Sequence, residues 1–255
     1  MTKVMIVGDT HGDAQFVSNI HAAARAANVD TIVQLGDFGY TFDRNLLASI
    51  EAWLDRDENH QWFWLDGNHD QHDFIEGVIL KDEFPGYPVP HFHDRMFYCH
   101  RGSITEIGGK TCMFMGGAYS IDKAWRKEYI SWWSQEMIRQ SDVTRALELA
   151  EGRTIDAVFS HDCPPSEYVD TWLKSEGYKV DHNSTANREA LGYVVDYVRP
   201  QHLYHGHYHL RYDAPYTTPD GWVTQCHGVG ANIQPVTFHR DPTAIYGQNY
   251  IIEEW

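Results

Sequence analysis

The sequence predicts an α/β protein, because its first third alternates buried strands with amphipathic helices. Short runs of branched or aromatic apolar residues, typical of buried strands, are separated by stretches with apolar residues at helical spacing. The strand runs lead into glycines that stand beside acidic, amide or imidazole side chains. Such an alternation builds a parallel sheet whose carboxyl ends carry the chemistry. The expected strands cover residues 3–7, 31–35 and 61–65, and the expected helices 13–27 and 46–57.

The rest of the chain predicts a less regular series of elements. Prolines interrupt residues 84–100, which favours a loop over the site. The strands expected next alternate like antiparallel strands, so we expect them to begin a second sheet. Because no repeat or linker divides the sequence, we expect one domain over residues 1–255. The further expected elements are strands 95–98, 103–107 and 111–115, helix 136–150, strand 157–160, helix 185–198, strand 202–205, and closing hairpins at 211–216, 222–227 and 250–253.

Composition limits the partners of this chain. Its formal charge of −16 argues against a long nucleic-acid groove, since phosphate neutralisation needs clustered Lys and Arg. The charge is compatible with a small phosphorylated substrate held mainly by metal ions. Four cysteines without a C-x-x-C pair predict buried thiols in a reducing compartment. The sequence has neither a signal-peptide pattern nor an apolar run that could cross a bilayer, so we expect a cytoplasmic protein with no membrane partner.

Five of the expected loops contain side chains of the kinds that bind metals. In the first loop, Asp9 and His11 offer an oxygen and a nitrogen one residue apart, so both can turn toward a common point. This mixed set suits a divalent metal of intermediate softness, such as manganese, iron or zinc. A lone D-x-H is weak evidence, because many surface loops hold both residue types. The other four loops carry Gly36-Asp37, Gly67-Asn68-His69-Asp70, Ser160-His161-Asp162 and Gly206-His207-Tyr208-His209.

These five pieces, in this order, resemble the motifs of calcineurin-like metallophosphoesterases, in particular the bacterial and phage-type phosphodiesterases. The resemblance extends from Asp9 to His209. It implies a four-layer α/β/β/α sandwich, in which two mixed sheets are flanked by helices and a two-metal site lies at the strand ends. It also implies hydrolysis of phosphoric esters, with a hydroxide between two metal ions attacking phosphorus in line. Manganese is the expected metal, with iron, zinc, nickel or cobalt as alternatives.

The resemblance further implies seven metal ligands, one of which bridges both ions. The ligands are Asp9, His11 and His209 for the first metal, Asn68, His161 and His207 for the second, and Asp37 as the bridge. His69 resembles the family's catalytic histidine, which protonates the leaving oxygen or stabilises the transition state. Many relatives orient this imidazole with an Asp three residues after the bridge, but here that position is Tyr40. Asp70 or Asp43 could substitute, and the sequence leaves the choice open.

Three basic residues are candidates for binding the substrate. Arg126 and Lys123 lie in a stretch, from residue 117 to residue 136, that resembles bacterial and phage members of the family. Either could clamp a phosphate oxygen, and an exposed Trp or Tyr there could stack on a base. Trp132 and Trp133 equally suit hydrophobic packing. Arg44 is a further candidate, because it follows the bridging carboxylate by a few residues.

The leading hypothesis is a phosphodiesterase acting on small nucleotide-type diesters, 2′,3′-cyclic ones included. A protein Ser/Thr phosphatase is one alternative, but Gly39-Tyr40 and Asp70 replace the Asp-Arg-Gly and Glu that those enzymes usually carry. A nuclease is another, and the acidity weighs against long substrates. A non-catalytic scaffold, as in retromer's metallophosphoesterase-like subunit, predicts eroded ligands, whereas all seven are present here.

Overall fold

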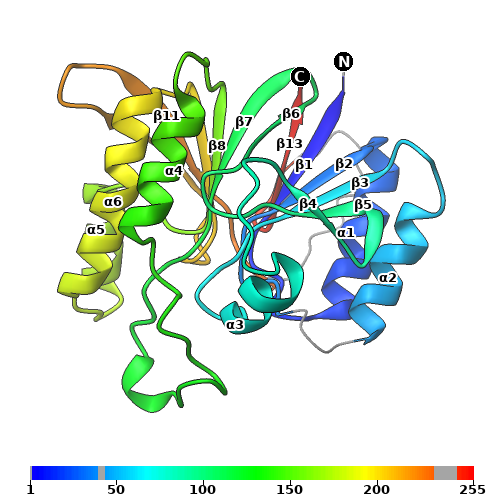
Figure 1. Cartoon of the computed structure of the whole chain (residues 1–255), viewed down its shortest axis with the longest axis horizontal. Helices are drawn as coiled ribbons and strands as arrows, with labels where there is room; N and C mark the ends of the chain where they lie inside the picture. Colours follow the sequence, from blue (N-terminus) through cyan, green and yellow to red (C-terminus); the bar gives the residue numbers. More distant parts are fainter. Residues whose placement is uncertain (1, 40–43, 233–245) are drawn as a thin grey trace.

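Two facing β-sheets with helices on their outer faces make up the computed structural model of the chain (Figure 1). The structure describes residues 2–39, 44–232 and 246–255. Within these ranges, the first sheet has seven strands in the order β12-β13-β1-β2-β3-β5-β4. The second has six strands in the order β10-β11-β9-β8-β7-β6. This arrangement confirms the predicted four-layer α/β/β/α sandwich.

The centre of the first sheet follows the strand–helix alternation of the sequence. β1 (Lys3–Val7) pairs in parallel with β2 (Thr31–Gln34), which pairs in parallel with β3 (Gln61–Trp64). The connecting helices α1 (Ala14–Ala27) and α2 (Arg44–Leu54) cover the outer face (Figure 1). Parallel pairing brings the three strand ends to one edge, which is where the polar motifs follow.

Residues 84–100 differ from the expected loop. β4 (Val89–His91) and β5 (His93–Tyr98) pair with each other, and β5 pairs in parallel with β3. Pro90 is compatible with a strand because β4 lies at the sheet edge, where a missing N–H is tolerated. Both strands therefore extend the first sheet, so the expectation that residues 95–98 begin the second sheet was wrong. Alternating side chains indicate a strand, but they do not indicate which sheet it joins.

The second sheet is mostly parallel, with an antiparallel strand at each edge. Its outer face is covered by α4 and α6 (Figure 1). The last strand, β13, returns to pair antiparallel with β1, so it closes the first sheet. The bounds are β6 (Ile104–Ile107), β7 (Lys110–Met115), β8 (Ala157–Ser160), β9 (His202–His205), β10 (Tyr212–Thr217), β11 (Val223–Gly228), β12 (Tyr246–Gly247), β13 (Tyr250–Glu254), α4 (Gln140–Ala150) and α6 (His182–Val198).

Three other findings on helices were not expected. The helix predicted over residues 136–150 starts only at Gln140, because Glu136 instead accepts hydrogen bonds from Ser120. α5 (Glu167–Ser175) was not predicted from the sequence. The Ser166 side chain caps this helix by accepting a hydrogen bond from the backbone of the helix. Shorter helical turns also occur in the loops. These are α3 (His72–Phe74), the π-helix η1 (Ile75–Ile79) and the 3₁₀-helix η2 (Lys123–Trp125).

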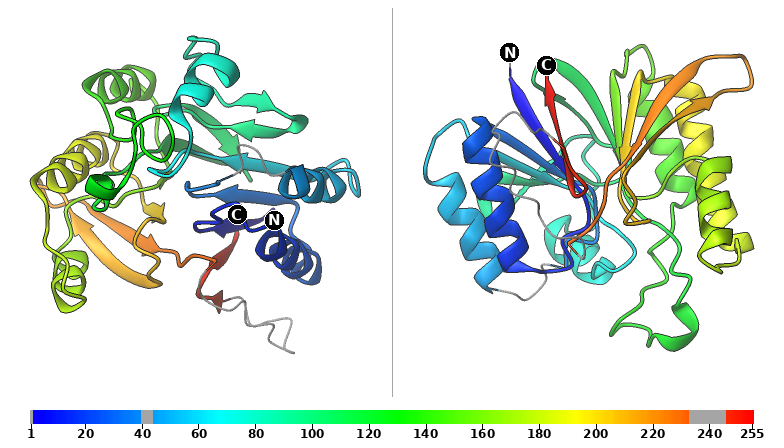
Figure 2. Two further views of the ribbon diagram at one scale, coloured as in Figure 1. Left: turned by 90° about the horizontal axis from the view of Figure 1, so that it is seen from below. Right: turned by 180° about the vertical axis from the view of Figure 1, so that it is seen from behind.

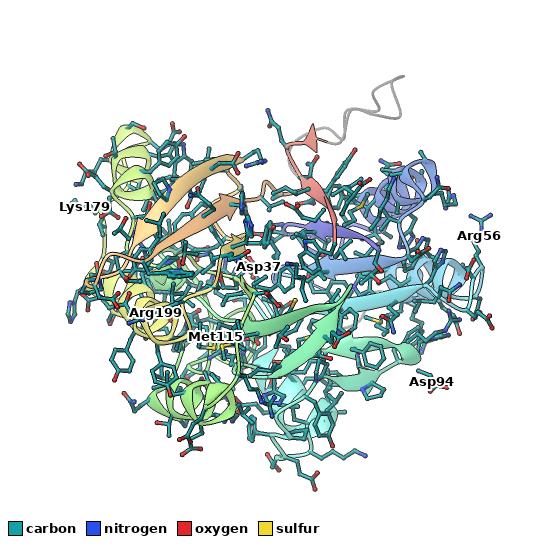
Figure 3. The ribbon with its side chains drawn as sticks, turned by 90° about the horizontal axis from the view of Figure 1, so that it is seen from above. Asp37, Arg56, Asp94, Met115, Lys179 and Arg199 are labelled. Atoms are coloured by element: carbon teal, nitrogen blue, oxygen red, sulfur yellow. The ribbon has the colours of Figure 1, made fainter. Side chains whose placement is uncertain are left out.

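The interface between the sheets is filled by apolar side chains of their inner faces. Its members include Val33, Phe63, Phe114, Phe159 and Tyr204, all at most 5% exposed. Figure 3 shows Asp37 near the middle of the molecule, where the two sheets meet. All four cysteines are buried and unpaired, as the sequence predicts. No helix among the described residues is long and apolar enough to traverse a bilayer.

One segment, residues 118–139, extends away from the sandwich beyond the strand ends (Figures 1 and 2). We call it the excursion. It leaves β7 and returns to α4, and it contains η2. The excursion and α5 lie on the side of the molecule where the polar loops converge, so both can contribute to a site there (Figure 1).

Candidate metal centre

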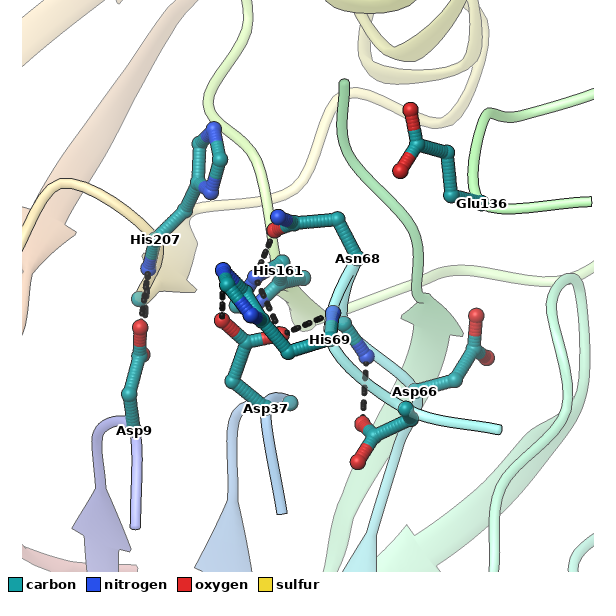
Figure 4. A network of polar contacts seen from close by, with 12 residues as sticks. Asp9, Asp37, Asp66, Asn68, His69, Glu136, His161 and His207 are labelled. Carbon is teal, nitrogen blue, oxygen red and sulfur yellow. Dashed lines mark hydrogen bonds and ion pairs between the residues drawn. The ribbon is translucent and has the colours of Figure 1, made fainter. Parts of the chain in front are cut away.

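Side chains from both sheets meet at the carboxyl ends of the strands (Figure 4). One atom each of Asp9, His11 and His209 lies within 4.8 Å of the others, and the same holds for Asp9, Asp37 and His161. Both carboxylates are buried, with Asp9 0% and Asp37 1% exposed. Segments separated by almost the whole chain are thereby assembled into one cluster of oxygen and nitrogen donors.

Asp37 lies between the two groups. Its Oδ2 is 3.5 Å from Nε2 of His11, and its Oδ1 is 3.4 Å from Nε2 of His161. On the far side of His11, Nε2 of His209 is 3.1 Å from Oδ2 of Asp9. Each oxygen of Asp37 thus faces a different imidazole, which is the orientation that a bridging carboxylate requires.

The hydrogen bonds of His161 show that this cluster fits a cation. Its Nδ1 is 2.7 Å from the carbonyl oxygen of Leu35, which only accepts, so Nδ1 donates. A neutral imidazole then directs the lone pair of Nε2 at Oδ1 of Asn68, 3.1 Å away, and at Oδ1 of Asp37. Three acceptors facing one another repel unless a proton or a cation lies among them. Oxygen and imidazole donors together suit a transition-metal ion.

The electrostatics of the cluster agree with this fit. Burial opposes a charge on the His161 imidazole, but the Asp37 carboxylate outweighs it and raises the pKa of His161 to about 10. Burial likewise opposes a charge on His11, yet Asp37 and Asp9 raise the pKa of His11 to about 9. The buried carboxylates therefore favour positive charge at the cluster, which bound metal ions would supply.

Four residues of the site have a left-handed backbone. The angle φ is 45° at His11, 50° at Asp37, 69° at His207 and 53° at His209. Side chains with a Cβ rarely adopt this conformation, which costs about 1–2 kcal/mol per residue. Such strain persists only where the surrounding structure enforces it, so these loops are held in place by their contacts.

Two glycines of the motifs are required by close packing on the carboxylates. A Cβ at Gly67 would lie 2.2 Å from Oδ1 of Asp37, and a Cβ at Gly206 would lie 2.1 Å from Oδ1 of Asp9. Neither carboxylate can move, because both are buried among the imidazoles. These glycines let the backbone of the loops after β3 and β9 approach the proposed ligands directly.

His207 joins the cluster differently from the other proposed ligands. Its backbone N–H donates to Oδ1 of Asp9 at 3.1 Å (Figure 4). Its ring centroid lies 5.0 Å from that of His161, and burial lowers the pKa of His207 to about 4. The imidazole is therefore next to the cluster and neutral, but outside the two close groups. Its role as a ligand remains a prediction.

His69 contacts Arg126 of the excursion. Nη2 of Arg126 is 3.0 Å from Nε2 of His69, and a guanidinium only donates, so Nε2 accepts. Burial lowers the pKa of His69; Arg126 adds to this decrease while Asp37 opposes it. Asp122 in turn holds Arg126 through two hydrogen bonds, of 2.6 and 2.7 Å. Arg126 therefore lies next to the proposed catalytic residue, with His69 as its partner, and its binding of a phosphate oxygen stays a prediction.

Asp70 does not orient His69. Its carboxylate accepts from the backbone N–H groups of Phe38, Gly39 and Gly67, which ties the loop after β2 to the loop after β3. Burial, reinforced by the Asp37 carboxylate, raises the pKa of Asp70 to about 7. The other candidate for this function, Asp43, lies outside the described residues, as does Tyr40.

The other two basic candidates are placed apart from the cluster. Nζ of Lys123 lies over the ring of Trp132, 3.9 Å from its centroid, so this ammonium is engaged within the excursion. Arg44 opens α2 with an exposed side chain. Among described residues, no hydrogen bond or ion pair joins Arg44 to the cluster. Trp133 is buried, in agreement with a packing role.

Sequence reasoning missed three polar residues that hold the proposed ligands. Oδ1 of Asn232 is 2.8 Å from Nδ1 of His11, which directs Nε2 of His11 toward Asp37. Oγ of Ser120 accepts from Nδ2 of Asn68 at 3.0 Å and donates to Glu136 at 2.6 Å. Ser120 and Glu136 lie in the stretch that resembles family members, but nothing in the sequence indicates their contact with a ligand, because these residues approach the cluster only through the fold.

Comparisons with known proteins agree with this architecture. The family model described as calcineurin-like phosphoesterase matches residues 2–211. The solved structure of TT1561 from Thermus thermophilus is similar in fold, with a TM-score of 0.54 and 11% identity over 90% of this chain and 89% of that one. A novel archaeal phosphodiesterase, 14% identical, is matched over 90% of this chain and 84% of that chain, with a TM-score of 0.37.

A search of curated proteins found no match. The family model, in contrast, spans most of the chain, including every strand end that contributes to the cluster. Together with a donor cluster that fits metal ions, this match indicates the general chemistry. The protein belongs to the calcineurin-like phosphoesterase family, and it is a metal-dependent hydrolase of phosphoric esters.

Proposed function

We propose that the protein is a dinuclear phosphodiesterase that hydrolyses small nucleotide-type diesters, 2′,3′-cyclic ones included. The observation that carries the proposal is the convergence of Nε2 of His161, Oδ1 of Asn68 and Oδ1 of Asp37 on one point, which fits a bound cation. The proposed ligands of the two ions are Asp9, His11 and His209, then Asn68, His161 and His207, with Asp37 shared.

Two bound divalent ions would supply Lewis acidity and an activated water for in-line attack on phosphorus. Manganese is the proposed metal, because carboxylate, amide and imidazole donors without a thiolate suit it. The chain's own contribution is orientation. Asn232 directs His11, Leu35 directs His161 and Ser120 directs Asn68, so each donor atom is held before the substrate arrives.

His69 is the proposed catalytic side chain besides the ligands. Its backbone N–H donates to Oδ1 of Asp37 at 2.7 Å, which fixes it at the edge of the cluster. In the arrangement described, Nε2 accepts from Arg126, so protonation of a leaving oxygen through Nε2 requires Arg126 to release it. Arg126 is then placed to bind a phosphoryl oxygen beside His69, which supports its proposed function in substrate binding.

The supply of positive charge supports a diester over a monoester. Between described residues, Arg126 is the one Arg or Lys side chain that contacts a proposed site residue, and Asp122 already neutralises it. A monoester brings nearly two negative charges at neutral pH and a diester brings one. A site whose cations are mainly metal ions therefore suits the singly charged ester. The same shortage disfavours a protein phosphatase.

The test compares two p-nitrophenyl esters over a titration with manganese. We expect kcat/KM for bis-p-nitrophenyl phosphate to exceed that for p-nitrophenyl phosphate, and activity to disappear with a chelator. Rapid hydrolysis of the monoester, or of a phosphopeptide assayed alongside, would instead indicate a phosphatase. Activity that survives complete removal of metal would contradict the proposed centre.

We also propose that the enzyme acts in the cytoplasm on small substrates and has neither a long nucleic-acid ligand nor a membrane partner. Support comes from the formal charge of −16 and from four buried, unpaired cysteines. Localisation of a tagged protein by cell fractionation tests the first part. Binding to a long single-stranded oligonucleotide at physiological salt would contradict the second.

A further inference from the structure

A cleft of about 750 Å³ opens beside the proposed metal centre. Its volume lies within the range of about 300–1,000 Å³ that is usual for small-molecule sites. One end of the cleft is formed by the polar loops, one wall by residues 119–125 of the excursion and another by residues 172–184. The lining residues at the polar end are Asp37, Asn68, His69, His207 and His209.

Both walls present aromatic side chains. Tyr119 and Trp125 come from the excursion, and Trp172 and Tyr178 come from α5 and the segment after it. Trp125 is 87% exposed and Tyr178 is 48% exposed. Large exposed aromatic groups that gather next to a polar centre indicate a ligand with a flat, weakly polar part.

The charges of the cleft restrict that ligand further. The charged side chains of the two walls are Asp122, which is paired with Arg126, and Lys179 and Asp181, whose charges offset each other. These walls therefore offer no net positive charge that would bind the additional phosphates of a polyphosphate. The flat part of the ligand is therefore uncharged, and its single negative charge lies at the metal centre.

The excursion is held at a fixed distance from the proposed ligands. Ser120 links the excursion to Asn68, and Arg126 links it to His69. Two adjacent residues of the loop after β3, Asn68 and His69, therefore anchor the excursion. Glu136, which is 1% exposed, accepts from both the backbone N–H and Oγ of Ser120. Figure 4 shows Glu136 beyond Asn68 on the side opposite Asp37. The first aromatic wall is thus positioned before a ligand binds, which lowers the cost of binding.

We infer that this cleft is a nucleoside subsite, in which Trp125 and Tyr178 bind the base of a diester whose phosphate lies at the metal centre. A base offers the flat uncharged face that these walls fit, and stacking on aromatic side chains tolerates different bases. The inference rests on the proposed function and adds the side chains that recognise the nucleoside of the substrate. In this inference the two aromatic walls of the cleft recognise the nucleoside, and the polar loops at the strand ends hydrolyse the diester.

The experiment compares two diesters that share charge and leaving group. p-Nitrophenyl thymidine 5′-phosphate carries a nucleoside, and methyl p-nitrophenyl phosphate carries a methyl group in its place. We expect the manganese-loaded protein to prefer the first, and Trp125→Ala or Tyr178→Ala to lower this preference in kcat/KM about tenfold. Trp125→Phe, which keeps a ring, should restore most of it. Tyr197→Ala is the matched control, because Tyr197 is 53% exposed on α6 and does not line the cleft.

Binding of thymidine itself, measured by calorimetry on the same proteins, separates the two proposals. If both esters are hydrolysed equally well, or if neither variant changes the preference, the subsite is contradicted while the phosphodiesterase stands. If neither ester is hydrolysed but thymidine binds and Trp125→Ala weakens it, the subsite stands and the proposed function fails. If thymidine does not bind and no ester is hydrolysed, both are wrong.

Discussion

Asn68 donates a hydrogen bond of 3.0 Å from Nδ2 to Oγ of Ser120, which links a loop of the first sheet to the excursion. This bond determines which atom of the amide faces His161, because the oxygen and nitrogen of an Asn side chain can exchange places by rotation. Glu136 accepts the hydroxyl proton of Ser120 at 2.6 Å and so leaves Oγ free to accept from Asn68. The orientation of a proposed ligand therefore depends on two residues 52 and 68 positions later in the chain.

Ser120→Ala should weaken metal binding. The change removes the acceptor for Nδ2 of Asn68, so the amide loses its fixed orientation, and loss of such a partner typically costs about 10–100-fold in metal affinity. Calorimetric titration of the metal-free protein with manganese measures it. Ser134→Ala, at an exposed position of the same excursion, is the control and should not change the affinity. Unchanged affinity in Ser120→Ala would show that Asn68 is held by other contacts or is not a ligand.

Asp37→Asn should abolish nearly all activity. The amide keeps one oxygen but cannot give a charged oxygen to each of two ions, so both proposed sites are weakened. Metal content after dialysis, measured by inductively coupled plasma mass spectrometry, should fall below two ions per chain. Asp213→Asn is a control at an exposed carboxylate of the second sheet that pairs with Arg211 and belongs to neither ligand group. Full turnover by Asp37→Asn would contradict the proposed centre.

His69→Ala should reduce the rate rather than metal binding. His69 is next to a proposed ligand, but its own Nε2 faces Arg126 and the edge of Asp37. Loss of a positioned acid–base group typically costs about 10²–10⁴-fold in kcat. The metal content of the variant should equal that of the unchanged protein. Loss of one metal from this variant would identify His69 as a ligand instead.

Acid should destabilise the first sheet through His21. This imidazole is 3% exposed and stacks on Trp53, and burial lowers its pKa to about 3 from the ordinary 6.5. Because the unfolded chain binds a proton between these values and the folded chain does not, its contribution to stability is complete above pH 6.5 and decreases as the pH falls toward 3.

The size of this effect can be measured with one variant. Between pH 7.5 and pH 5, His21→Gln should lose about 1–2 kcal/mol less free energy of unfolding than the unchanged protein. Urea unfolding at both pH values measures the difference. His182→Gln, at an exposed position of α6, should show no such change in slope. Equal pH dependence in His21→Gln and the parent would show that other groups control the acid transition.

The sequence by itself predicted most of the strands and helices and the loops that carry the proposed ligands. Local patterns suffice for this prediction. A strand such as β1 is indicated by its run of apolar residues, and its end is indicated by Gly8 and the polar residues that follow. Parallel strands then bring those ends to one edge whatever the details of packing. Five of the predicted ligands, Asp9, His11, Asp37, His161 and His209, therefore lie in close groups, although residues 9 and 209 are far apart in the chain.

Tertiary structure decided which sheet each strand joins and which contacts orient the site. β5 pairs with β3 rather than opening a second sheet, because edge pairing depends on the packing of whole layers and not on alternation within one segment. Asn232, Ser120 and Glu136 reach the cluster through loops that no pattern describes. Arg126 similarly meets His69 only because the excursion folds back over the strand ends. A hydrogen bond between distant residues depends on distances of a few tenths of an ångström, and only the complete fold determines those distances.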